Sequence, residues 1–83
     1  MDTCLTGCLI QLMARYGYEN MGKLFVALTE MAAQHSLLDC ELVNRELKLR
    51  GIEKVQVDEA GLRLALEALQ RSGFVEAAPV AVN

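Results

Sequence analysis

Apolar residues recur at helical spacing along four stretches of the chain, and these stretches predict four helices. In residues 3–16, apolar side chains three or four positions apart fall on one stripe of a helix. The members of this stripe are Leu5, Leu9, Leu12, Met13 and Tyr16. Two glycines and an asparagine within residues 17–22 then predict a turn that ends the helix.

The second stretch, residues 23–35, is apolar around most of its circumference, which is typical of a buried central helix. Val26 and Ala33 extend this apolar surface beyond its central line. His35 lies at the end of the stretch, where a protonated imidazole interacts favourably with the helix dipole. We therefore expect a structural role for this histidine rather than a ligand or catalytic role.

A third helix is predicted over residues 39–50, with Asp39 as its N-cap and Gly51 directly after its end. Residues 52–57 then alternate apolar and polar side chains, a period of two that predicts a short strand or an extended connector.

A fourth helix is predicted over residues 59–72, with Asp58 as its N-cap and an inward stripe of leucines. Gly61 in its first turn is expected to permit close helix packing. Gly73 ends the helix, and Phe74 is placed for the hydrophobic contact that accompanies a Schellman ending.

The stretch VDEAGLRLALEALQRSGFVEA, residues 57–77, resembles the third helix and first wing strand of winged helix-turn-helix domains. The matching features are the capped start, the leucines at helical spacing, and the glycine that leads into an apolar segment. The stretch ELVNRELKLRGI, residues 41–52, is similar to the second helix of that family, and residues 23–35 would be its first helix.

This resemblance covers residues 23–77 and implies a single, mainly α domain of winged helix-turn-helix type. The expected domain has three core helices within residues 23–82, an N-terminal extra helix within residues 1–17, and a minimal C-terminal β-wing. Two features depart from the family pattern, namely the long connection over residues 51–58 and the short wing. A plain four-helix bundle is the alternative fold.

The composition favours one small domain with an aliphatic core. The chain has 83 residues, of which 53% are hydrophobic and only 5% aromatic, and its formal net charge is −3. No apolar run approaches the roughly 18 residues of a membrane span. The first apolar stretch also lacks the basic region of a signal peptide. We therefore expect a cytoplasmic protein without membrane contact.

Three cysteines make a complete disulfide framework improbable. Cys4, Cys8, His35 and Cys40 could in principle form a tetrahedral zinc site. Free cysteines more often behave as small buried hydrophobes, and redox chemistry is a third possibility. Apolar packing is the favoured interpretation, so no cofactor is expected.

The resemblance implies that the fourth predicted helix enters the major groove of double-stranded DNA. Arg63 and Gln70 would then read base edges, while Arg45, Lys48 and Lys54 form a modest basic cluster. Acidic and basic residues balance within residues 41–73, however, and Glu41–Arg45, Glu59–Arg63 and Glu67–Arg71 are favourable i, i+4 pairs. A solvated helix face therefore also explains these charges.

Two functions follow as hypotheses. The first is a small winged-helix DNA-binding transcriptional regulator acting as a homodimer, with the stripe of residues 3–16 as its dimer or partner contact. The second is a winged-helix-like protein-interaction module (an adaptor, inhibitor or assembly factor) that does not bind DNA. The sequence contains no Gly-rich phosphate loop, His-Glu-x-x-His motif or Gly-x-Ser-x-Gly elbow, so we do not expect an enzyme.

Overall fold

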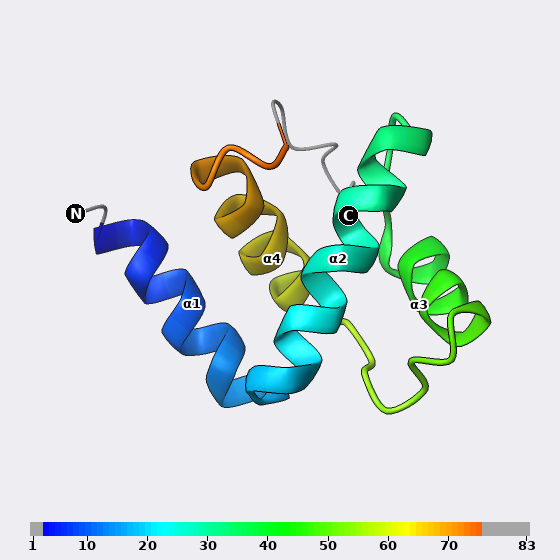
Figure 1. Ribbon diagram of the computed structural model, residues 1–83, viewed down its shortest axis with the longest axis horizontal. Helices are drawn as coiled ribbons and strands as arrows, with labels where there is room; N and C mark the ends of the chain where they lie inside the picture. Colours follow the sequence, from blue (N-terminus) through cyan, green and yellow to red (C-terminus); the bar gives the residue numbers. More distant parts are fainter. Residues whose placement is uncertain (1–2, 76–83) are drawn as a thin grey trace.

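The computed structural model describes residues 3–75, and in that part of the chain the protein is mainly α. Its helices are α1 (Thr3–Tyr16), α2 (Tyr18–Gln34), α3 (Cys40–Leu49) and α4 (Glu59–Arg71). In Figure 1, α1 and α2 form a V, α4 lies between them, and α3 lies on the far side of α2 from α1. The prediction of a mainly α domain is confirmed.

No strand forms within residues 3–75. The predicted wing begins at Phe74 and Val75, which are not in a strand, and its remaining residues lie outside the described part of the chain.

The predicted turn over residues 17–22 is wrong, because a single glycine separates the first two helices. Gly17 adopts φ 82°, in the left-handed region that favours glycine, and α2 begins at the next residue. Gly22 lies exposed inside α2, where a glycine costs only about 1 kcal/mol relative to alanine. Met21 is buried in the same turn, so tertiary burial offsets that cost.

The other helix ends confirm the predicted caps. The carboxylates of Asp39 and Asp58 accept hydrogen bonds of 2.8 Å from backbone N–H groups in the first turns of α3 and α4. Gly51 and Gly73 adopt φ 81° and 85°, and each lies within a Schellman ending. Phe74 donates its N–H to Leu69 O at 3.0 Å, although its ring stays 69% exposed.

The connector between α3 and α4 is extended but is not a strand. Val55 and Val57 are buried while Lys54 and Gln56 are exposed, as the alternation predicts. The Asn44 side chain of α3 forms the hydrogen bonds to the connector backbone that a neighbouring strand would otherwise form. Its amide oxygen accepts the Val57 N–H at 2.8 Å, and its amide nitrogen donates to Val57 O at 3.0 Å.

The core is aliphatic, as expected. α2 packs against each of the other helices, whereas α4 packs most extensively along α1 and α3 packs mainly against α2. Leu12 and Leu62 are completely buried where α1 meets the core. Gly61 permits the close approach of α1 and α4, because a Cβ there would overlap the Tyr16 hydroxyl. This confirms the packing role predicted for Gly61.

Candidate functional site

The predicted basic cluster lies on α3 and the connector. Arg45, Lys48 and Lys54 are exposed, and no described residue forms an ion pair with any of them. The predicted Glu41–Arg45 pair is therefore wrong. A hollow of about 380 Å³ beside the cluster is lined by acidic, basic and neutral side chains. They belong to Glu41, Asn44, Arg45, Lys48, Glu53, Val55 and Gln56.

The predicted base-reading residues lie on a different helix. Arg63 and Gln70 are exposed on α4, and Arg63 is paired with Glu59 at 3.9 Å. The Glu67–Arg71 pair is also present, at 3.2 Å. No hydrogen bond or ion pair between described residues joins this helix face to the cations of α3. The five predicted DNA-binding residues thus lie on three elements, with Arg45 and Lys48 on α3, Lys54 on the connector, and Arg63 and Gln70 on α4.

The apolar stripe predicted to contact a second subunit is largely used within the chain itself. Leu12 is fully buried, and Leu5, Leu9 and Tyr16 are half-buried against the core. A dimer contact through Leu12 is therefore wrong, since its side chain has no exposed surface. Only Met13 of the stripe is substantially exposed.

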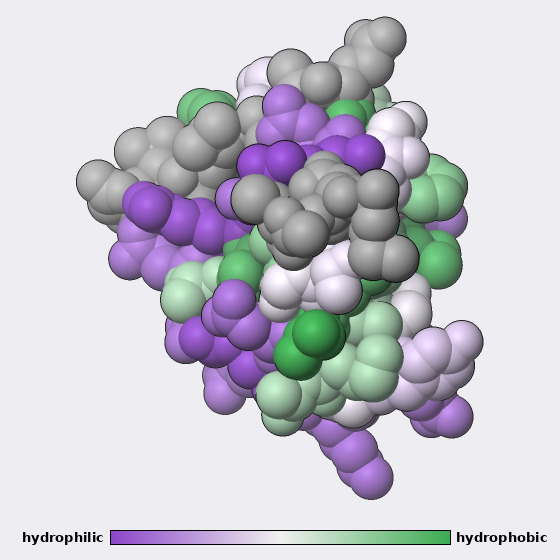
Figure 2. Space-filling model, turned by 90° about the vertical axis from the view of Figure 1, so that its left-hand side faces the viewer, coloured by the Kyte–Doolittle hydropathy of each residue, from purple (hydrophilic) through white to green (hydrophobic). Residues whose placement is uncertain are grey.

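The opposite side of α1 is mostly uncharged and includes exposed apolar residues, which helical periodicity alone did not indicate. Ile10 is 63% exposed there, and Arg15 is the one charged residue within Thr3–Tyr16. Arg15 lies at the border between this side and the side that packs on the core, and its guanidinium is 3.1 Å from the Asp58 carboxylate. Figure 2 looks onto this side of the molecule and shows hydrophobic residues near its middle, with hydrophilic residues to the left.

A polar corner joins α1, α4 and the connector. A hollow of about 490 Å³ lies there, lined by Arg15, Tyr16, Asn44, Gln56, Val57 and Asp58. The Gly61 N–H and the Arg15 guanidinium hold the pKa of Asp58 below its usual value. Burial, together with the Asp58 carboxylate, raises the pKa of the Tyr16 phenol. Arg15 and Asn44 already make structural contacts here, so the corner stabilises the fold.

The described residues hold no metal-binding group of three His, Cys, Asp or Glu side chains. Cys8 is buried, and its thiol donates to the Glu67 carboxylate at 3.4 Å. Cys40 is half-buried, and burial raises the pKa of its thiol, with Glu59 and Asp58 raising it further. Both side chains pack with the core, as predicted for Cys8 and Cys40.

The most distinctive surface lies along α2, and the sequence pattern misjudged it. Val26 is 63% exposed, although residues 23–35 were predicted to form a buried central helix that is apolar around most of its circumference. Tyr18, which lies in the segment predicted as a turn, is 77% exposed. A domain of this size has too few elements to surround a central helix completely. An apolar position on a side that no other element covers therefore remains at the surface.

Phe25 and Val26 line two hollows, which together we call the α2 groove. The first has a volume of about 800 Å³ and is lined by Tyr18, Glu19, Met21, Gly22, Lys23, Phe25, Val26, Ala27, Arg50, Gly51 and Ile52. The second, of about 450 Å³, is lined by Phe25, Val26, Thr29, Glu30, Ala68, Leu69, Ser72 and Phe74. The groove therefore borders α2, the end of α3 and the end of α4.

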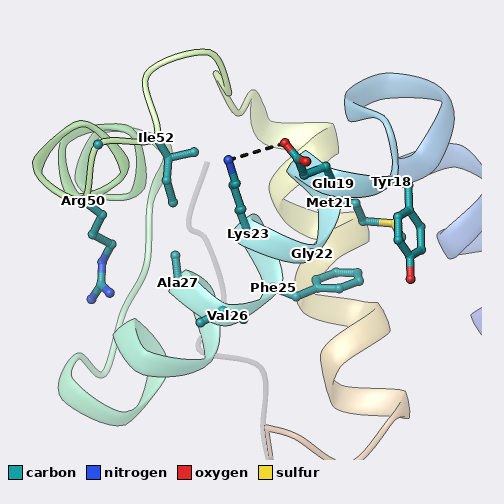
Figure 3. A pocket seen from close by; sticks show the side chains of 11 residues that line it. Tyr18, Glu19, Met21, Gly22, Lys23, Phe25, Val26, Ala27, Arg50 and Ile52 are labelled. Atoms are coloured by element: carbon teal, nitrogen blue, oxygen red, sulfur yellow. Dashed lines mark ion pairs between the residues drawn. The ribbon is translucent and has the colours of Figure 1, made fainter.

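Figure 3 shows how the first hollow is built. Arg50 and Ile52 reach toward α2 from the end of α3, while Tyr18 and Phe25 project from another side of α2. The charged side chains at the border are already paired within the chain. Lys23 Nζ lies 3.6 Å from the Glu19 carboxylate, and Arg50 is paired with Glu30. The groove thus presents an apolar surface, and the charged side chains beside it neutralise one another.

None of the described helices combines the length and hydropathy needed to cross a membrane. Comparison with known proteins identifies no relative, because no protein-family model, curated protein or solved structure matches this chain.

Proposed function

We propose that this protein is a protein-interaction module that binds an uncharged, apolar helical segment in the α2 groove. The observation that carries this proposal is the position of Phe25 and Val26 between two hollows, beside the exposed rings of Tyr18 and Phe74. Exposed apolar surface of this kind marks interaction sites on small soluble domains. A groove beside a helix fits the apolar face of an amphipathic helix.

The energetics support an apolar ligand. Burying a fully exposed valine or phenylalanine side chain contributes about 1.5–3 kcal/mol. Val26 and Phe74 are 63% and 69% exposed, so covering them contributes part of this amount each, which offsets part of the cost of association. The pairs Lys23–Glu19 and Arg50–Glu30 leave no free charge at the border to attract an ionic segment. Hydrophobic contact therefore provides the affinity, and shape provides the selection.

A peptide selection tests this function. A displayed library of short helical peptides is selected on the wild-type chain and counter-selected on Val26→Asp, whose side chain is exposed in the free protein. We expect selected peptides to carry apolar residues at positions i, i+3 or i+4, and i+7. They should shift the NMR signals of Phe25 and Phe74. The absence of peptides that prefer the wild-type chain would refute the proposal.

DNA binding by a winged-helix domain, with α2, α3 and α4 as its core helices, is the second candidate. One observation favours it: Arg45, Lys48 and Lys54 have no ion-pair partner among the described residues, whereas Arg15 and Arg63, for example, are paired. Unpaired surface cations are suited to phosphate contacts, whose contribution is largest at low salt. The test is binding of random duplex DNA at about 50 mM salt, with Lys48→Glu as the variant expected to lose it.

A further inference from the structure

We infer that the α2 groove binds the outer face of α1 from a second copy of this chain, an inference that rests on the function proposed above. The outer face of α1 is the side turned away from the core, formed by Thr6, Gly7, Ile10, Met13 and Ala14. The groove and this face belong to consecutive helices joined at Gly17. Each copy therefore carries both halves of the contact.

The composition of α1 is the first observation. A surface helix ordinarily turns charged residues toward water, opposite the stripe that faces the core. Here the outer face contains no charged residue, and Ile10 is 63% exposed on it. The single charge of the helix, Arg15, lies at the edge and contacts Asp58. Burying the exposed Ile10 side chain in an apolar groove is more favourable than leaving it in water.

Charge complementarity is the second observation. Each copy has a formal net charge of −3, so two copies repel each other, and contact through uncharged surfaces adds no local repulsion to this. The ion pairs Lys23–Glu19 and Arg50–Glu30 leave the groove neutral, and the outer face of α1 is uncharged. These two surfaces can therefore meet without bringing unpaired charges together.

A two-fold axis is the arrangement that closes this pairing, because two different surfaces can otherwise link copies into an open chain. When α1 of the first copy lies in the groove of the second, a two-fold axis places α1 of the second in the groove of the first. Both contacts then form together and close a dimer. Because the contact is apolar and each copy is acidic, dimerisation should strengthen with added salt, which screens the repulsion.

The experiment uses two full-length variants at exposed positions. Ile10→Glu places a negative charge on the outer face of α1, and Val26→Lys places a positive charge in the groove. Sedimentation is measured from about 5 to about 500 µM, with far-UV circular dichroism as the check on folding. We expect a wild-type dimer, and dissociation constants raised at least tenfold for each variant alone.

The equimolar mixture is the decisive sample. In a mixed dimer the first contact joins two unaltered surfaces, and the second brings the Ile10→Glu carboxylate to the Val26→Lys ammonium group. We expect native mass spectrometry to show more mixed dimer than either variant forms alone. Leu49→Glu is the matched control, since Leu49 is an exposed leucine outside both surfaces and its replacement should leave the dimer intact.

Several results would overturn the inference. A wild-type chain that stays monomeric at the highest concentration excludes the dimer, while selected peptides that still bind the groove leave the proposed function standing. Dissociation by Ile10→Glu but not by Val26→Lys indicates contact between two α1 helices and excludes the groove. If the full chain neither dimerises nor binds peptides, and a chain without residues 76–83 does, then the groove is occupied by the chain's own C-terminal segment.

Discussion

Replacing Gly61 by alanine tests the close packing of α1 on α4. In an open helical position this change stabilises a helix by about 1 kcal/mol. At Gly61 the added Cβ would overlap the Tyr16 hydroxyl and lie 3.0 Å from Asp58 Oδ1. Overpacking of this kind costs about 1–3 kcal/mol, because the Tyr16 side chain or the helix packing must shift to make room. After the helix gain of about 1 kcal/mol is subtracted, we expect a net loss of up to about 2 kcal/mol in the free energy of unfolding.

The partner substitution removes the obstruction. Tyr16→Phe deletes a buried hydroxyl that has no hydrogen-bond partner among the described residues. Its loss should leave stability unchanged or raise it by up to about 1 kcal/mol. In that background the ring carbon Cζ is the nearest remaining atom of Tyr16, 3.3 Å from the added methyl group. Gly61→Ala should then be neutral or slightly stabilising, which gives a coupling of about 2 kcal/mol between the two positions.

Urea unfolding followed by far-UV circular dichroism measures the four variants of this cycle at one protein concentration. Gly22→Ala is the control, since Gly22 lies within α2 and a Cβ there meets no atom within 4 Å. We expect that control to gain about 0.5–1 kcal/mol. A steric clash between the two positions is excluded if Gly61→Ala stabilises the protein as much as Gly22→Ala, or if the loss is the same with phenylalanine at position 16.

Three further predictions concern single side chains. A backbone N–H and a nearby guanidinium hold the pKa of Asp58 below its usual value. The carboxylate therefore contributes fully to stability above pH 3.8, and this contribution is lost as the pH falls further. Asp58→Asn should weaken the dependence of the free energy of unfolding on acidic pH, measured by urea unfolding. Glu59→Gln should lower the raised pKa of the Cys40 thiol and speed its alkylation at a fixed pH, measured by mass spectrometry; an unchanged rate would contradict the electrostatic cause. Asn44→Ala should cost about 1–3 kcal/mol, because both backbone groups of Val57 lose their partner, whereas an exposed substitution would cost little.

The sequence determines most of the helix ends, because each depends on a local interaction. Asp39 and Asp58 cap helices through hydrogen bonds within their own first turns, and Gly51 and Gly73 end helices through their own φ angles. The aliphatic stripe of α4 also follows from spacing alone. These features need no knowledge of the rest of the molecule, since the interacting groups are close in the chain.

Local patterns misjudged features that depend on distant residues. Residues 17–22 contain turn-forming residues, yet burial of Met21 extends α2 to Tyr18. Residues 52–57 have the period of a strand, yet the partner that holds Val57 is the Asn44 side chain of α3. Sequence separation hides such partners, so neither outcome could be obtained from periodicity.

The candidate site also depends on residues that are distant in the sequence. From the sequence, Leu12 lay on the apolar stripe of its predicted helix and Val26 lay beside the central apolar line of its helix, but neither position showed which surface another element would cover. The packing of α1 along α4 buries Leu12 completely, whereas no described element covers Val26. The sequence by itself determined which residues are apolar and where most helices begin and end. Only the tertiary structure decided which apolar faces the core uses and which stay at the surface, because the three other described helices do not cover every side of α2.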